Sequence, residues 1–77
     1  MKQLLIDMVK AIVDKPEEVA VEIEETESVL IYKLSIGEGD LGKVIGKKGK
    51  NVSALKVIMS AFNAKDSEKR LILEVIE

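Results

Sequence analysis

The sequence predicts a two-layer α+β domain whose elements follow the order α-β-β-α-α-β. Apolar residues recur at helical spacing in two stretches, and three other stretches show strand-like alternation or short β-branched runs. A pair of glycines three residues apart separates a short helical segment from the second long one. Helices on one face of a three-stranded mixed sheet would give every element an apolar partner. At 77 residues, we expect a single domain spanning residues 1–77.

The first predicted helix covers residues 2–14, where apolar pairs recur every four residues and form one stripe. Lys15 precedes Pro16, and a residue before proline is disfavoured in the helical region, so the helix should end near Asp14. Residues 19–25 alternate apolar and polar side chains, which predicts a strand with one solvent-exposed face.

Two further strands are predicted. Residues 29–36 are apolar on both faces, which is typical of a more buried strand, and residues 26–28 before it should turn to close a tight hairpin. Residues 70–76 form the last strand, which we expect to pair in parallel through a crossover, because helices precede it.

Between these strands, Asp40 is a suitable N-cap for a short helix over residues 41–45. A longer helix should run from residue 50 or 51 to about 63, followed by a turn at 65–68. Its predicted core stripe consists of Val52, Leu55, Met59 and Phe62, with Ile58 alongside.

Charge is divided unevenly along the chain. Residues 41–65 carry six Lys and no acid, whereas residues 17–27 carry six Glu and no base, although the net charge is only −2. A domain polarised in this way can attract an anion at one end and repel it at the other.

Composition excludes most catalytic and metal-dependent classes. The chain has no Cys and no His, and no cluster of nucleophile, base and oxyanion donor can be assembled. No apolar run approaches the ~18 residues of a membrane span, and the N-terminus lacks a signal-peptide pattern. We therefore expect a cytoplasmic, non-enzymatic protein with no catalytic residue, metal, cofactor, small-molecule substrate or membrane contact.

Two glycine patterns resemble nucleotide-binding loops only superficially. Residues 37–42 match G-x-G-x-x-G and residues 37–43 match the first part of a P-loop. However, Glu38 and Asp40 would face the pyrophosphate, and Val44 stands where a P-loop needs Ser or Thr. Turn glycines before a capped helix are the favoured interpretation.

The segment Gly46-Lys47-Lys48-Gly49 is more informative. Glycine lets another backbone approach closely, and the N–H groups that start the next helix face the same place as the lysines. These features together would hold a phosphodiester backbone. A helix–turn–helix corner with solvated lysines is the alternative.

Residues 44–52, VIGKKGKNV, resemble the signature of KH domains, whose G-x-x-G loop clamps a short single-stranded nucleic acid. The element order matches the type II KH arrangement, and the resemblance covers essentially the whole chain, as in small bacterial single-KH-domain RNA-binding proteins. It implies no catalytic role, and it implies these RNA-binding residues: Lys43, Ile45, Gly46, Lys47, Lys48, Gly49 and Lys50.

The resemblance also implies that bases lie in an apolar groove between the loop, the two helices and a neighbouring strand, with Ile45 and Val52 flanking the loop. Single-stranded RNA or DNA is the implied ligand. A homodimer or a heterodimer with a larger KH-containing protein is implied too, as is a role in post-transcriptional regulation and in cell elongation and division. Because aromatic residues are scarce, we expect low sequence specificity.

Ala54, Val57 and Ala61 widen the apolar arc of the longer helix beyond one stripe. Three interpretations remain open: a wide core under the last strand, part of the nucleic-acid groove, or a dimer interface. The last of these connects to a competing function, a protein-interaction module that keeps the KH fold without binding nucleic acid.

Overall fold

The computed structural model describes the main chain of residues 1–77 and the side chains of residues 1–65 and 67–77. The helices are α1 (Lys2–Lys10), α2 (Leu41–Ile45) and α3 (Lys50–Asp66), with short 3-10 helices η1 (Pro16–Glu18) and η2 (Lys47–Gly49). The strands are β1 (Ala20–Glu25), β2 (Val29–Ser35) and β3 (Arg70–Ile76). The predicted order α-β-β-α-α-β is confirmed.

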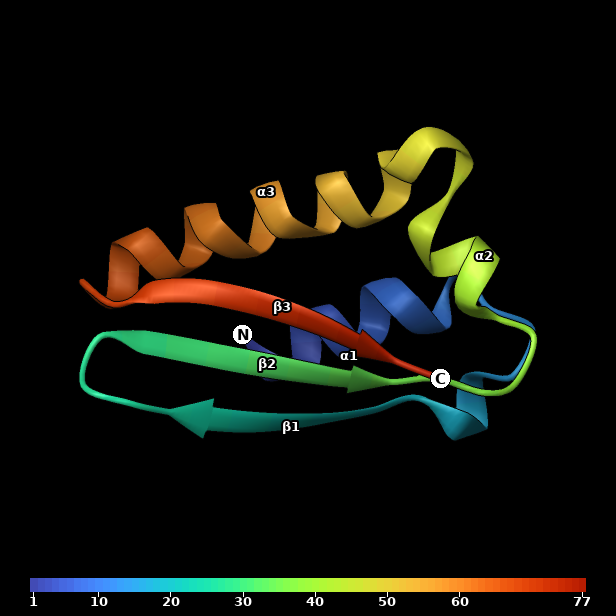
Figure 1. The fold of residues 1–77 in the computed structure, drawn as a ribbon, viewed down its shortest axis with the longest axis horizontal. Helices are drawn as coiled ribbons and strands as arrows, with labels where there is room; N and C mark the ends of the chain where they lie inside the picture. The colour runs from blue at the N-terminus through green and yellow to red at the C-terminus, as the bar shows by residue number, and fades with distance from the viewer.

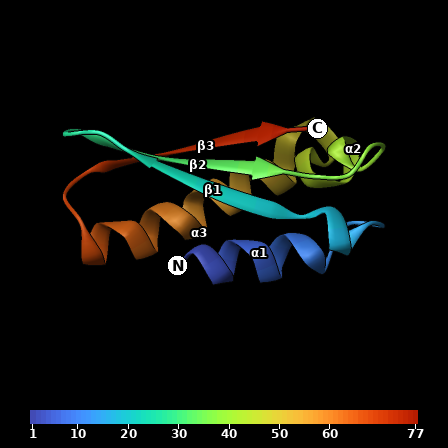
Figure 2. The ribbon, with the colours of Figure 1, turned by 90° about the horizontal axis from the view of Figure 1, so that it is seen from below.

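Across residues 1–77 the strands form one three-stranded mixed sheet in the order β1-β2-β3. Strand β1 pairs with β2 antiparallel, and β2 pairs with β3 in parallel through the crossover that contains α2 and α3 (Figure 1). Figure 2 shows α1 and α3 together on one side of this sheet. The predicted two-layer α+β fold, with its hairpin and its parallel pair, is therefore confirmed.

The hydrophobic core lies between the sheet and the helices. Its fully buried side chains come from every layer: Leu5 and Val9 from α1, Leu34 from β2, Val44 from α2 and Met59 from α3. Burial of each such aliphatic side chain stabilises the fold by roughly 1.5–3 kcal/mol. This core packs α2 and α3 against the sheet.

Helix α1 ends at Lys10, so the prediction of an end near Asp14 is wrong. The buried carboxylate of Asp40 accepts hydrogen bonds from the N–H groups of Asp14 at 3.1 Å and Lys15 at 3.0 Å. Because these two N–H groups donate to Asp40, they cannot also donate to the carbonyl groups four residues earlier, as a longer α1 would require. Asp40 does occupy the predicted N-cap position of α2, but among the described side chains its carboxylate makes no capping bond and holds this linker instead.

The predicted stripe of α3 is correct in its middle and wrong at two positions. Leu55 and Met59 are buried as predicted, but Ile58 is 38% exposed, and Phe62 is 51% exposed with Asn63 buried in its place. Asn63 is the four-residue continuation from Met59, and its Nδ2 donates to the carbonyl of Lys69 at 2.6 Å. This hydrogen bond joins the end of α3, which runs beyond the predicted end near residue 63, to the start of β3.

Candidate nucleic-acid interface

The candidate site lies where α2 turns into α3. The Gly46 N–H donates to the Gly42 carbonyl at 2.8 Å and closes α2, and the Gly49 N–H donates to the Gly46 carbonyl at 3.1 Å. Gly46 has φ 75° and ψ 174°, and Gly49 has φ 76° and ψ 16°. Side-chain-bearing residues rarely adopt these conformations, so both glycines are needed for this tight reversal of the chain.

The loop carries exposed positive charge. The side chains of Lys47, Lys48 and Lys50 are exposed, and they form no ion pair with any acid whose side chain the structure describes. Lys43 Nζ lies 3.5 Å from Asp14 Oδ2, in a pair open to solvent. Such exposed pairs contribute little to stability, so Lys43 is also available to an anion.

The N-terminus of α3 adds hydrogen-bond donors at the same place. Its N-cap is Gly49, its first turn contains no acid, and none of the described side chains caps it. The first N–H groups of a helix lack intrahelical acceptors and lie at the positive end of the helix dipole. Lysine charge and main-chain donors together suit a phosphate group.

The structure places the predicted site residues at this one junction. Ile45 is 36% exposed beside the loop, whereas its neighbour Val44 is fully buried. Val52 is partly buried and packs against the core, so it is a core residue more than a surface contact.

Asn51 was not predicted as part of the site. Its Nδ2 donates to the carbonyl of Lys43 at 2.7 Å, across the whole loop. The only sequence signal was an amide side chain in the first turn after a glycine loop, and such side chains often bond to nearby main chain.

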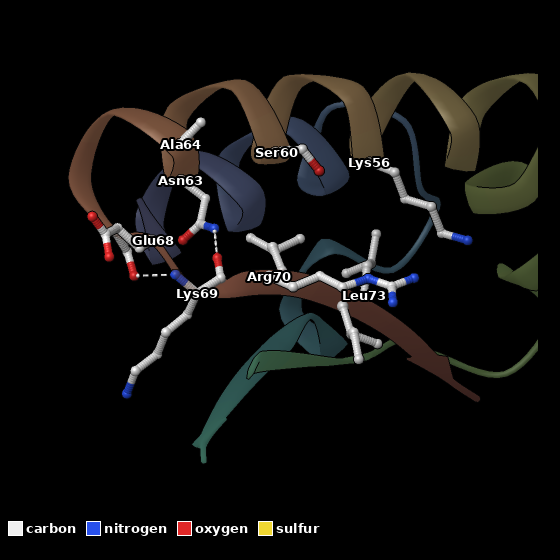
Figure 3. A pocket seen from close by; sticks show the side chains of 11 residues that line it. Lys56, Ser60, Asn63, Ala64, Glu68, Lys69, Arg70 and Leu73 are labelled. Carbon is white, nitrogen blue, oxygen red and sulfur yellow. Dashed lines mark hydrogen bonds between the residues drawn. The ribbon is translucent and has the colours of Figure 1, made fainter. Parts of the chain in front are cut away.

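A cleft of about 770 Å³ runs between α3 and β3 (Figure 3). Its lining consists of Lys56, Ser60, Asn63 and Ala64 from α3 and residues 67–73. Figure 3 shows the charged groups of Lys56 and Arg70 at the same end of this cleft. Strand β3 is an edge strand, so main-chain N–H and C=O groups on its outer edge are free to bond a ligand.

Most of the acidic strand lies away from the loop at residues 46–49. Strand β1, which carries Glu22 and Glu24, forms the opposite edge of the sheet from β3, but Glu25 at its end forms an ion pair with Lys69 beside the cleft. The hydrogen bond from Lys33, at 2.7 Å, lowers the pKa of the Glu24 carboxyl and raises that of the Lys33 ammonium. The charge separation expected from the sequence therefore holds for Glu22 and Glu24, whereas Glu25 reaches the end of the cleft.

Comparison with known proteins agrees with this geometry. The family model described as KhpA/KhpB, KH domain matches residues 2–75. The chain belongs to the KhpA/KhpB family of KH domains. Its fold is the type II KH fold, and the family is a non-enzymatic one, as the sequence predicts.

Several curated relatives carry the name RNA-binding protein KhpA. The one from Listeria monocytogenes is 42% identical over 77 residues, which is 100% of both chains. The one from Clostridium acetobutylicum is 40% identical over 76 residues, covering 99% of this chain and 100% of the relative. The one from Chlamydia trachomatis is 38% identical over 77 residues, covering 100% and 97%. No solved structure showed a significant match.

The described residues of this KH domain contain neither a metal-binding cluster nor a membrane-spanning helix. Among the residues that the structure describes, no group of three or more acidic side chains is arranged to hold a metal ion. Within the same residues, no helix has the length and apolar character to cross a membrane.

Proposed function

We propose that this KH domain binds single-stranded RNA through the loop formed by residues 46–49. The observation that carries the proposal is the set of exposed lysines, without described acidic partners, at the uncapped N-terminus of α3. The name of the curated relatives supports RNA as the ligand class. Single-stranded DNA, which has the same phosphate backbone, is a weaker candidate.

Each site residue has a distinct role in this proposal. Gly46 and Gly49 let the RNA backbone approach, and Lys47 and Lys48 contact phosphates. Lys43 and Lys50 extend the positive surface on either side, and Ile45 offers an apolar contact to a sugar or base. From the loop, the bases would follow α3 towards the cleft beside β3, which is lined by polar and charged side chains as well as apolar ones. Tyr32 is buried, and the exposed Phe62 lies near the end of α3 opposite the loop, so we expect low sequence specificity.

Reversing charge in the loop tests the proposal. The double variant Lys47→Asp/Lys48→Asp should weaken binding of a short unstructured RNA about tenfold or more, because two phosphate contacts become repulsive. The salt dependence should also become shallower, by about 0.7 in logarithmic slope for each lost contact. Fluorescence anisotropy at two salt concentrations measures both effects.

The matched control is Lys2→Asp/Lys65→Asp, which makes the same charge change on exposed residues at the start of α1 and in the last turn of α3, away from the loop in the sequence. This control should bind RNA nearly as well as the wild type. Equal losses in both variants would mean that net charge, and not the loop, governs binding. Failure of the wild type to bind would favour the protein-interaction function.

We infer that the exposed face of α3 mediates pairing with a second copy of the chain. Val57 is 69% exposed and Phe62 is 51% exposed, while Ala54 and Ala61 beside them are also exposed. The interpretation of this arc as a wide core is therefore wrong. A large apolar patch on a small domain favours a partner, and a larger KH-containing protein could use the same face.

The variant Val57→Glu should abolish this self-association without unfolding the domain, because the side chain already lies in solvent. Sedimentation velocity over a concentration series measures the change. Lys56→Gln, on the adjacent exposed position, lowers the net charge by the same single unit and is the matched control. A wild type that stays monomeric at high concentration would overturn the dimer proposal.

In the cell, we propose that the domain acts in the cytoplasm on RNA after transcription. Its family resemblance further favours a contribution to cell elongation and division. No cofactor or small-molecule substrate is needed for this role.

A further inference from the structure

The carbonyl groups at the end of α2 need donors from outside the helix. The last four carbonyls of a helix have no intrahelical partner. The Gly46 N–H bonds the carbonyl of Gly42, and the next carbonyl, that of Lys43, accepts from Asn51 Nδ2 at 2.7 Å. Asn51 belongs to the first turn of α3, so a side chain of α3 caps the C-terminal end of α2 across the loop.

This hydrogen bond encloses the part of the chain with the least favourable backbone. Between Lys43 and Asn51, Lys48 adopts φ 55° and ψ 26°, a left-handed conformation that costs a non-glycine residue free energy. Gly46 and Gly49 also have positive φ. A loop of this kind keeps one shape only when its surroundings fix it, and the cross-loop hydrogen bond does so.

The Asn51 side chain also packs directly on the first glycine of the loop. A Cβ atom at Gly46 would lie 2.7 Å from Asn51 Cγ. The absence of a side chain at 46 is therefore what allows the amide at 51 to reach the carbonyl of Lys43. The two residues form a complementary pair.

We propose that Asn51 is the positioning residue of the RNA-binding loop, an inference that rests on the proposed function. It acts through Lys43 and Gly46, and not through a direct contact with RNA. By tying α2 to α3 it holds the loop lysines and the N–H groups of α3 at one place, so that both can meet the same phosphates.

The test compares Asn51→Ala and Asn51→Asp with Ser53→Ala, a matched control on an exposed residue of the same helical turn. RNA affinity should fall about threefold to tenfold in Asn51→Ala, the change that one neutral hydrogen bond represents. It should fall further in Asn51→Asp, whose added negative charge also repels phosphate. It should stay within about twofold for Ser53→Ala. Affinity is measured by anisotropy at a temperature where circular dichroism shows every variant folded.

A spectroscopic measurement separates positioning from general stability. In the wild type, nuclear Overhauser contacts should join the Asn51 side-chain amide protons to Gly46. In Asn51→Ala, the amide resonances of residues 46–49 should shift or broaden, while those of β1 and β2 stay in place. Unchanged loop resonances, or RNA affinity equal to the wild type, would overturn the proposal.

The two proposals can fail separately. If the wild type does not bind RNA, the proposed function fails, and the loop resonances alone decide whether Asn51 positions the loop. If both Asn51 variants unfold, the wild-type spectrum decides. The absence of Overhauser contacts between the Asn51 side-chain amide protons and Gly46 would then overturn the proposal.

Discussion

Replacing Gly46 by alanine is expected to lower the free energy of unfolding by about 2 kcal/mol or more and to abolish RNA binding. At φ 75° and ψ 174°, residue 46 lies in a region that is essentially restricted to glycine. An added Cβ would also lie 2.9 Å from the main-chain nitrogen of Asn51, which cannot move aside without displacing α3. Both effects act on the loop, so binding should be lost even where the rest of the domain remains folded.

Urea unfolding and RNA anisotropy measure the two parts of this prediction. Gly42→Ala is the matched control, because Gly42 lies inside α2 and a Cβ there would meet nothing within 4 Å. That change should be neutral or should stabilise the domain by up to about 1 kcal/mol, the helix preference of alanine over glycine. Equal effects at positions 42 and 46 would contradict the assignment of a special backbone role to Gly46.

The second large effect is expected for Asp40→Asn, at about 2 kcal/mol of lost stability. Asp40 is 2% exposed, and its two carboxylate oxygens each accept one main-chain N–H, from Asp14 and from Lys15. Asparagine has only one acceptor oxygen, so its NH₂ group would face an N–H donor. One buried donor would lose its partner, and the link between α1 and β1 would loosen.

Thermal or urea unfolding measures the loss for Asp40→Asn, and hydrogen exchange of the Asp14 and Lys15 amides locates it. Glu38→Gln, on an exposed residue of the same loop, removes a charge in the same way and should have little effect. Unchanged exchange at residues 14 and 15 would show that the carboxylate does not hold the linker.

Most of the fold was predictable because its signals are local. The bounds of α2 and β3 match the predicted ranges, since capping residues, glycines and β-branched runs mark them within a few residues. The end of α1 was not predictable, because it depends on a carboxylate far along the chain, that of Asp40. Asn63 is buried in place of Phe62 because of the rotation of α3 about its own axis relative to β3. Helical spacing alone does not determine this rotation to within one residue.

The candidate site likewise contains residues that the sequence identifies and residues that only tertiary contacts bring into place. Residues 43–50 are consecutive, so a motif of glycines and lysines is sufficient to find them. Asn51 contributes through a tertiary contact with α2, and the cleft residues Lys56 and Arg70 come together only when α3 packs beside β3. These residues carry no pattern of their own in the sequence.

The parallel pairing of β2 with β3 also has a consequence for how the domain is made. Val29 pairs with Arg70, so the central strand β2 cannot complete its pairing until β3 has been synthesised, after both helices of the crossover. The β1–β2 hairpin that emerges first is at best marginally stable by itself. Contacts between such distant residues slow folding, and the site therefore becomes functional in one late, cooperative step. A nascent chain that has not yet made β3 should bind no RNA through this loop.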